Sequence, residues 1–196
     1  MHRITPINPD SKSILTKVYK ESFFLPKQRK CFTSDNEVLR WALDLRYSLA
    51  KSRLLTPLTE EIIKILDKEK ITQIVGRGYG SFFLIGAILA KKPNLRAGLI
   101  RYSQKPYGFK KLIEGDLRKN SRTLIIDDII ASGQSIKLVR DILRIKKIPV
   151  YGGLCIFRFG WKDLTGLPKT FKIFSVGVLH YKEKNSTRTQ HKTIDQ

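Results

Sequence analysis

The stretch TLIIDDIIASGQSI, residues 123–136, decides the fold class of this chain. Four apolar or β-branched residues come first and are closed by two carboxylates, Asp127 and Asp128, which is the pattern of a strand buried on both faces. A turn of small residues follows and leads into SIKLVRDILRIKK, where apolar residues recur at helical spacing. A buried strand, a turn and an amphipathic helix make one βα step, the repeating unit of an α/β protein, and we expect a mainly parallel twisted sheet flanked by helices.

The segments on either side extend this pattern. Upstream, LTPLTEEIIKILDKEK predicts a helix with Thr56 as its N-cap and Pro57 in its first position. Residues 71–75 predict a strand that runs into GRGYGS, residues 82–90 predict a helix, and AGLIRY predicts another strand. Downstream, VYGGLCIFRF and TFKIFSVGVLHY predict two more strands. Residues 103–122 form a long polar connection, which we expect to lie outside the core.

Length and composition allow one globular domain of ordinary size, because the chain has 196 residues of which 41% are hydrophobic. No apolar run approaches the roughly 20 residues of a membrane span, and the N-terminus has no apolar region typical of a secretory signal. We therefore expect a cytoplasmic protein without a membrane partner. Neither the two cysteines, Cys31 and Cys155, nor the three histidines have the spacing of a transition-metal site.

The net charge of +21 is the one extreme property of the composition. A charge of this size predicts a polyanionic partner, which leaves three choices: nucleic acid, an acidic membrane surface or a phosphorylated small substrate. The charge alone does not choose among them.

The residues that carry chemistry follow the central strand. In an open α/β sheet ligands gather at the carboxyl ends of the strands, where Asp127 and Asp128 would lie. The turn beyond them opens a helix, so its backbone N–H groups and the helix dipole favour one bound anion such as a phosphate. A ribose, whose hydroxyl groups face the acids, would fit between the two. The alternative is an Asp pair that only caps a turn.

This whole stretch resembles the signature of the type I phosphoribosyltransferases, which bind 5-phosphoribosyl-1-pyrophosphate (PRPP). The resemblance implies that Asp127 and Asp128 lie near the ribose hydroxyls and that Mg²⁺ bridges ribose and pyrophosphate, held mainly by PRPP and not by the protein. It also assigns the 5-phosphate to the turn residues Ala131, Ser132, Gly133, Gln134 and Ser135.

Four other segments resemble the orotate phosphoribosyltransferase branch of that family. GRGYGS is similar to the pyrophosphate loop, which adds Arg77, Gly78, Tyr79 and Gly80 to the PRPP-binding set. LIRYSQKPYGFKKLIEG is similar to the mobile catalytic loop, in which Arg101, Lys105 and Gly108 match, while Tyr102 and Tyr107 replace a lysine and a histidine. LDLRYSLAKSRLLTP matches at Asp44, Arg46 and Pro57. CIFRFGW resembles the strand end that carries a base-contacting arginine, here Arg158.

The resemblance implies a pentosyltransferase, a class of glycosyltransferase, that moves phosphoribose from PRPP to an orotate-like or other pyrimidine base and releases pyrophosphate. Because departing pyrophosphate develops negative charge, cations are needed there, and we assign catalysis to Lys105, Arg101 and Asp128. It further implies a homodimer, an N-terminal hood lobe (1–55), a phosphoribosyltransferase core (56–181) and a flexible basic tail (182–196). The competing hypothesis is a phosphoribosyltransferase fold redeployed as a nucleic-acid-binding regulator or nucleoprotein component, for example of an anti-phage system.

Overall fold

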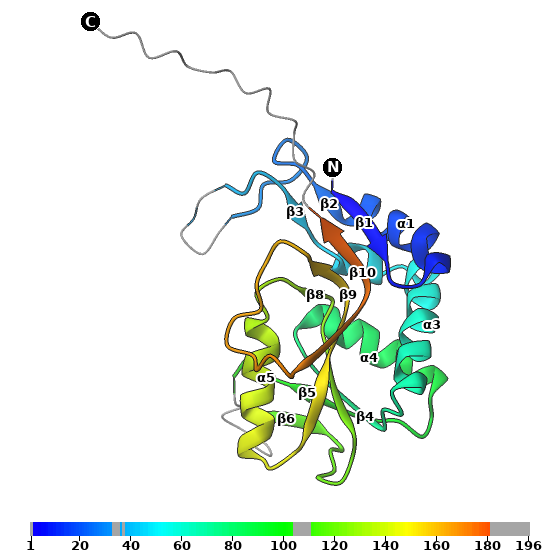
Figure 1. Cartoon of the computed structure of the whole chain (residues 1–196). Helices are drawn as coiled ribbons and strands as arrows, with labels where there is room; N and C mark the ends of the chain where they lie inside the picture. The colour runs from blue at the N-terminus through cyan, green and yellow to red at the C-terminus, as the bar shows by residue number, and fades with distance from the viewer. Residues whose placement is uncertain (1, 33–35, 37, 104–110, 181–196) are drawn as a thin grey trace, which may run out of the picture.

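The computed structural model describes residues 2–32, 36, 38–103 and 111–180. Within them, eight strands form one sheet in the order β1-β10-β9-β7-β4-β5-β6, with β8 paired to β9 (Figure 1). The parallel strands are β4 (Gln73–Arg77), β5 (Arg96–Ile100), β7 (Thr123–Ile126), β8 (Ile129–Ile130), β9 (Val150–Phe159) and β10 (Lys172–His180). The antiparallel strands β1 (Arg3–Pro6) and β6 (Ile113–Gly115) form the two edges.

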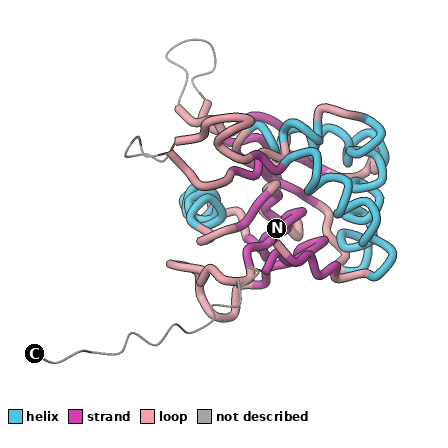
Figure 2. The backbone as a smooth tube through the Cα atoms, turned by 90° about the horizontal axis from the view of Figure 1, so that it is seen from above, coloured by secondary structure: helices cyan, strands magenta, loops and turns pink. Residues whose placement is uncertain are grey.

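Helices cover both faces of this sheet. Seen from above, one face carries the larger helical group and the other carries a single helix (Figure 2). The larger group contains α1 (Lys12–Ser22), α2 (Arg46–Leu49), α3 (Ser52–Lys68) and α4 (Tyr79–Lys91), and the single helix is α5 (Gln134–Ile145). A one-turn 3₁₀ helix, η1 (Pro9–Ser11), precedes α1, and β2 (Phe23–Phe24) pairs with β3 (Ala42–Leu43) apart from the main sheet. No helix in the described ranges is long and apolar enough to span a bilayer.

The alternation of side chains along β7 divides the core into two clusters. Leu124 and Ile126 point to the face that packs against α3 and α4, while Ile125 points to the face that packs against α5. All three are essentially fully buried, as expected for a strand whose neighbours are parallel and whose two faces are covered. The residues that open TLIIDD are therefore apolar without alternation because both faces of the strand lie in the core.

The predicted fold class is confirmed: an α/β protein with a mainly parallel sheet flanked by helices. The predicted start of the helix before β4 is wrong, because α3 begins at Ser52, so that Pro57 lies inside the helix and not in its first position. Leu54 is buried and continues the apolar face of Leu58 toward the N-terminus. Proline removes one backbone hydrogen bond, a loss that this extra buried turn offsets.

The expectation for residues 103–122 is also wrong in part. Residues Ile113–Gly115 of this connection form β6, which closes one edge of the sheet by antiparallel pairing with β5. Leu112, Ile113 and Leu117 pack against the core cluster beneath α5. Leu117 lies directly over Gly98 of β5, where a Cβ atom would meet it at 2.7 Å. Three apolar residues in a polar segment, Leu112, Ile113 and Leu117, are enough to hold it on the core.

Candidate active site

The Asp pair stands at the carboxyl end of the central strand and its backbone is fixed by β9. The N–H of Asp127 donates to the carbonyl of Leu154 at 2.9 Å, and the carbonyl of Asp128 accepts the N–H of Ile156 at 3.1 Å. Each carboxylate also accepts a hydrogen bond from the next residue's backbone: Asp127 Oδ1 from the N–H of Asp128 at 2.9 Å, and Asp128 Oδ1 from the N–H of Ile129 at 3.0 Å. The two acidic groups are thus held in place before any ligand arrives.

These two carboxyl groups lack sufficient positive charge around them. Burial, and after it the charge of Asp128, raises the pKa of Asp127 to about 8. Burial also raises the pKa of Asp128. A shift caused by burial at the ligand edge of a sheet is characteristic of a functional site. Hydroxyl donors or a divalent cation would stabilise the ionised pair, since carboxylate oxygens are ligands that Mg²⁺ prefers.

The glycine-rich loop between β4 and α4 closes on this pair. A Cβ atom added to Gly80 would collide with the carboxylate of Asp128, so only glycine allows so close an approach. Gly78 has a φ of +102°, a conformation that side-chain-bearing residues rarely adopt. The hydroxyl of Ser81 donates to the carbonyl of Gly78 at 2.8 Å and holds the turn. The glycines predicted to bind PRPP are therefore brought to the acid pair.

The turn assigned to the 5-phosphate lies at the N-terminus of α5. Its left-handed Gly133, with a φ of +80°, immediately precedes the first helical residue, Gln134. The carbonyl of Ser132 accepts the N–H of Thr165 at 2.9 Å, which ties the turn to the loop after β9. The first N–H groups of a helix have no partner within the helix, and its dipole favours an anion there. The five assigned residues are thus contiguous at an anion-binding terminus.

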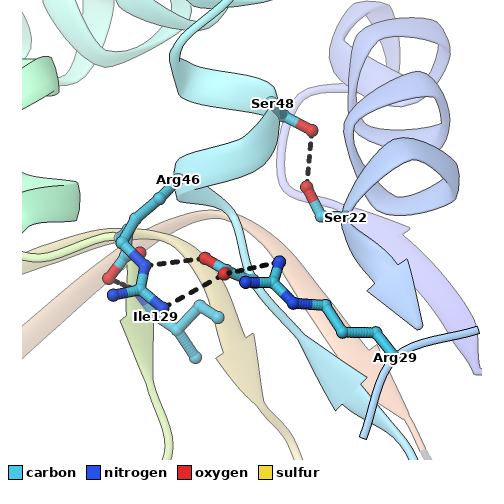
Figure 3. Close-up of polar contacts among 7 residues, drawn as sticks. Ser22, Arg29, Arg46, Ser48 and Ile129 are labelled. Atoms are coloured by element: carbon cyan, nitrogen blue, oxygen red, sulfur yellow. Dashed lines mark hydrogen bonds and ion pairs between the residues drawn. The ribbon is translucent and has the colours of Figure 1, made fainter. Parts of the chain in front are cut away.

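A third segment, between β3 and α2, also faces the acid pair. Arg46 donates two hydrogen bonds to Asp44, from Nε at 2.7 Å and from Nη2 at 3.1 Å, and Arg29 lies 3.7 Å from the same carboxylate (Figure 3). The pKa of Arg46 is raised chiefly by its hydrogen bonds to Asp44, with smaller electrostatic contributions from Asp128 and Tyr102. The sequence pattern had matched Asp44 and Arg46 without giving them a place in the site. The Asp-x-Arg spacing was the only signal in the sequence that could have placed these two residues in the site.

Three arginines carry a buried Nε without a hydrogen-bond partner among the described residues: Arg77, Arg101 and Arg158. Arg77 ends β4, Arg101 follows β5 and Arg158 lies near the end of β9, so all three stand at the carboxyl edge of the sheet. Arg101 makes one long ion pair to Glu114, at 3.4 Å. Buried polar groups are nearly always satisfied by protein, water or ligand. Guanidinium groups whose hydrogen-bond donors lack a partner at this edge favour an anionic ligand.

One predicted catalytic residue cannot be placed beside these groups. Lys105, together with Tyr107 and Gly108, lies outside the described residues. The catalytic and binding roles of the residues that are described remain predictions. Their common location is an observation, because the Asp pair, the glycine loop and the N-terminus of α5 meet at one edge of the sheet.

Comparisons with known proteins agree with this arrangement. No family model matches the chain. It is 27% identical over 129 residues to the orotate phosphoribosyltransferase of Methanosphaera stadtmanae, an alignment covering 65% of this chain and 70% of that protein. It is 29% identical over 143 residues to the orotate phosphoribosyltransferase of Methanocaldococcus jannaschii, covering 68% and 74%.

Solved structures extend the likeness to the fold. The orotate phosphoribosyltransferase of Mycobacterium tuberculosis H37Rv, in complex with Fe(III) dicitrate, superimposes with a TM-score of 0.69 at 18% identity, covering 87% of this chain and 96% of that one. The same enzyme in complex with PRPP gives a TM-score of 0.65 at 17% identity over the same shares of the two chains. Taken together, these findings show that the chain is similar in sequence to orotate phosphoribosyltransferases and shares the fold of the type I phosphoribosyltransferases.

Proposed function

We propose that this protein is a Mg²⁺-dependent phosphoribosyltransferase that transfers phosphoribose from PRPP to a ring nitrogen of an orotate-like or other pyrimidine base and releases pyrophosphate. The observation that carries the proposal is the buried, adjacent Asp127 and Asp128, held between the glycine loop and the N-terminus of α5. Two adjacent acids favour the hydroxyl groups of a ribose, and a helix N-terminus at the same edge of the sheet favours its 5-phosphate.

Mg²⁺ fits the donor set at this edge. Burial is the first cause of the raised pKa values of Asp127 and Asp128, and a bound cation would favour their ionised forms. Mg²⁺ keeps several non-protein ligands and is bound by few carboxylates together with substrate phosphates, so PRPP would hold most of it. When bound, the ion would offset the negative charge of the pyrophosphate. The carboxylates would orient the ribose hydroxyls beside it.

The leaving group requires further cations. In the transfer, the bond from C1 of the ribose to the pyrophosphate oxygen breaks with its electron pair on that oxygen, a bond from the base nitrogen to C1 forms, and the base loses a proton to solvent. Preorganised cations stabilise charge that develops in this way. Arg77 and Arg101, each with an unpartnered buried Nε, are suited to this role, and Lys105 is assigned to it by its place in the sequence.

The acceptor base is assigned to the end of β9. Arg158 pairs in register with Ile130 of β8, close to the acid pair along the same edge, and its Nε is buried without a protein partner. A guanidinium group recognises a carboxylate or adjacent carbonyl oxygens through paired donors, which suits a pyrimidine that carries such groups. The orotate-like relatives support this choice, and the homodimer stays an expectation from the same resemblance.

The direct test is an assay with radiolabelled PRPP against orotate, uracil and the purine bases, with and without Mg²⁺. We expect turnover with a pyrimidine base that requires Mg²⁺ and falls by more than about 100-fold in Asp128→Asn, since a preorganised polar group in a site is worth that much. Asp141→Asn, which removes a partly exposed carboxylate of α5 that is paired with Lys137, is the matched control and should keep wild-type turnover. Absence of turnover with every base, or full turnover in Asp128→Asn, would refute the proposal.

The nucleic-acid-binding alternative rests on the charge of +21, on the substituted catalytic loop and on the basic tail. The relatives and structures compared above are named as phosphoribosyltransferases, which favours the enzyme. If the surface also binds nucleic acid, its affinity for single-stranded RNA should fall steeply with salt, because each neutralised phosphate releases counterions. An affinity that is independent of salt, or undetectable at low salt, would exclude this second role.

A further inference from the structure

The end of β5 places a tyrosine over the arginine of the glycine loop. Strands β4 and β5 are parallel neighbours in which Arg77 pairs with Ile100, so the residues that leave both strands lie side by side. The guanidinium carbon of Arg77 lies 4.3 Å from the centre of the Tyr102 ring. This is well within the range of a cation–π interaction. The contact joins two segments that are 25 residues apart in the sequence.

The tyrosine is itself held against the loop. A Cβ atom on Gly78 would lie 2.9 Å from the Tyr102 hydroxyl oxygen, which shows that this hydroxyl rests on the bare backbone of the loop. The ring of Tyr79 lies 6.2 Å from that of Tyr102. Nevertheless 60% of Tyr102 is exposed, and a cavity of about 300 Å³ adjoins it. The ring is therefore part of the site's wall and not of the core.

An aromatic ring holds a cation without neutralising it. Among the described residues, no carboxylate forms an ion pair with Arg77, and its buried Nε has no hydrogen-bond partner. Arg101 differs, because Glu114 lies 3.4 Å from it. A carboxylate partner would cancel the charge of Arg77, whereas the ring quadrupole attracts the guanidinium and leaves its charge available to an anion. The pairing with Tyr102 thus preserves a fixed cation at the loop.

We propose that Tyr102 is a positioning residue that fixes the guanidinium of Arg77 to bind the diphosphate group of PRPP and the pyrophosphate product. The inference rests on the proposed function, because it assigns the diphosphate to the loop that contains Arg77. It also gives a physical reason for a tyrosine in place of a lysine at this position. Tyr102 orients the cation of Arg77 in the glycine loop, whereas a lysine would supply a second cation of its own.

Isothermal titration with Mg²⁺ and three ligands tests the inference: pyrophosphate, PRPP, and ribose 5-phosphate as the probe without a diphosphate. In Tyr102→Leu we expect the affinities for pyrophosphate and PRPP to fall by roughly 5- to 30-fold, the span from an exposed to a desolvated cation–π contact. The affinity for ribose 5-phosphate should change by less than about twofold. Tyr102→Phe keeps the ring and should stay within about threefold of wild type for all three ligands.

The chain offers a matched control for this substitution. Tyr151 also stacks under an arginine, with the guanidinium carbon of Arg122 at 3.4 Å from its ring centre, but it lies at the start of β9, at the opposite end of the sheet from the site. Tyr151→Leu removes the same kind of contact and should leave all three affinities unchanged. A double-mutant cycle adds a second criterion: in an Arg77→Gln background, Tyr102→Leu should cause no further loss of pyrophosphate affinity.

The outcomes separate the inference from the function on which it rests. If the wild-type protein binds PRPP and Tyr102→Leu binds pyrophosphate equally well, the inference is overturned and the proposed function stands. An equal loss of ribose 5-phosphate affinity, or additive losses in the cycle, would show a general structural role for Tyr102 and would also overturn it. If the wild-type protein binds neither PRPP nor pyrophosphate, the proposed function fails and the inference fails with it.

Discussion

Replacing Asp127 by asparagine is expected to stabilise the ligand-free protein, although it removes a residue assigned to ribose binding. Asp127 is 9% exposed, and burial, followed by the charge of Asp128, raises its pKa from 3.8 to about 8. Between these two pH values the folded chain keeps a proton that the unfolded chain has released. The stability contributed by this group is therefore complete below the unfolded pKa and is lost as the pH rises toward the folded pKa.

The size of the effect follows from this difference in pKa. Each unit corresponds to about 1.4 kcal/mol, so the rise from 3.8 to neutral pH sets an upper limit of about 4 kcal/mol. Relaxation and water entry reduce such penalties in proteins, and we expect Asp127→Asn to raise the free energy of unfolding by about 1 to 3 kcal/mol near pH 7. Asparagine keeps the side-chain oxygen that accepts the N–H of Asp128 at 2.9 Å, so the local geometry should persist.

Urea titration of the ligand-free protein at about pH 4, 5.5 and 7 measures this gain. It should be largest at neutral pH and should shrink toward zero as the pH falls to about 4 and below, where the unfolded chain also takes up the proton. Asp141→Asn is the control, because it removes a carboxyl group from a partly exposed position where Lys137, 2.9 Å away, lowers the pKa of the carboxyl. It should give no gain. A loss of stability in Asp127→Asn near pH 7, or an equal gain at every pH, would refute the reasoning.

Three further predictions concern the loops around the acid pair. Gly80→Ala should weaken PRPP binding by more than about tenfold in isothermal titration, because a Cβ atom would displace the carboxylate of Asp128; unchanged affinity would contradict the close approach. In thermal denaturation, Gly133→Ala should lower the free energy of unfolding by about 1 to 2 kcal/mol, because the φ of Gly133 is +80°. The control is Gly86→Ala in α4, where an added Cβ meets nothing within 4 Å, and this change should raise the free energy of unfolding. Arg46→Gln should shift the pH at which PRPP binding is half-maximal upward, because the charge of Arg46 lowers the pKa of Asp128, which burial raises; an unshifted profile would show that Arg46 does not act on Asp128.

Much of the fold was predictable because its signals are local. The apolar run before Asp127, the helical spacing after it and the strands later called β9 and β10 follow from periodicity within a dozen residues. The parts that were missed depend on distant partners. Ile129 and Ile130 become β8 only because Phe157 and Arg158 lie alongside them, and β6 exists only because β5 offers an open edge.

The candidate site divides in the same way. The residue types of the Asp pair, the glycine loop and the turn before α5 were readable in order along the chain, since each stands at the end of a predicted strand or the start of a predicted helix. Their contacts were not. Nothing in the spacing of Gly80 and Asp128 indicates that one touches the other, and an Asp-x-Arg pair gives no sign that Arg46 faces an acid more than 80 residues away.

The sequence by itself therefore determined the α/β architecture and predicted ribose-phosphate chemistry for the strand end at Asp127 and Asp128, because hydrophobic periodicity and turn chemistry act between neighbours in the chain. Only the tertiary structure decided how that chemistry is supported. It buried the two acids and raised their pKa values, and it set Tyr102 against Arg77. Burial and cation–π contact depend on distances between segments that the chain connects only through the folded sheet.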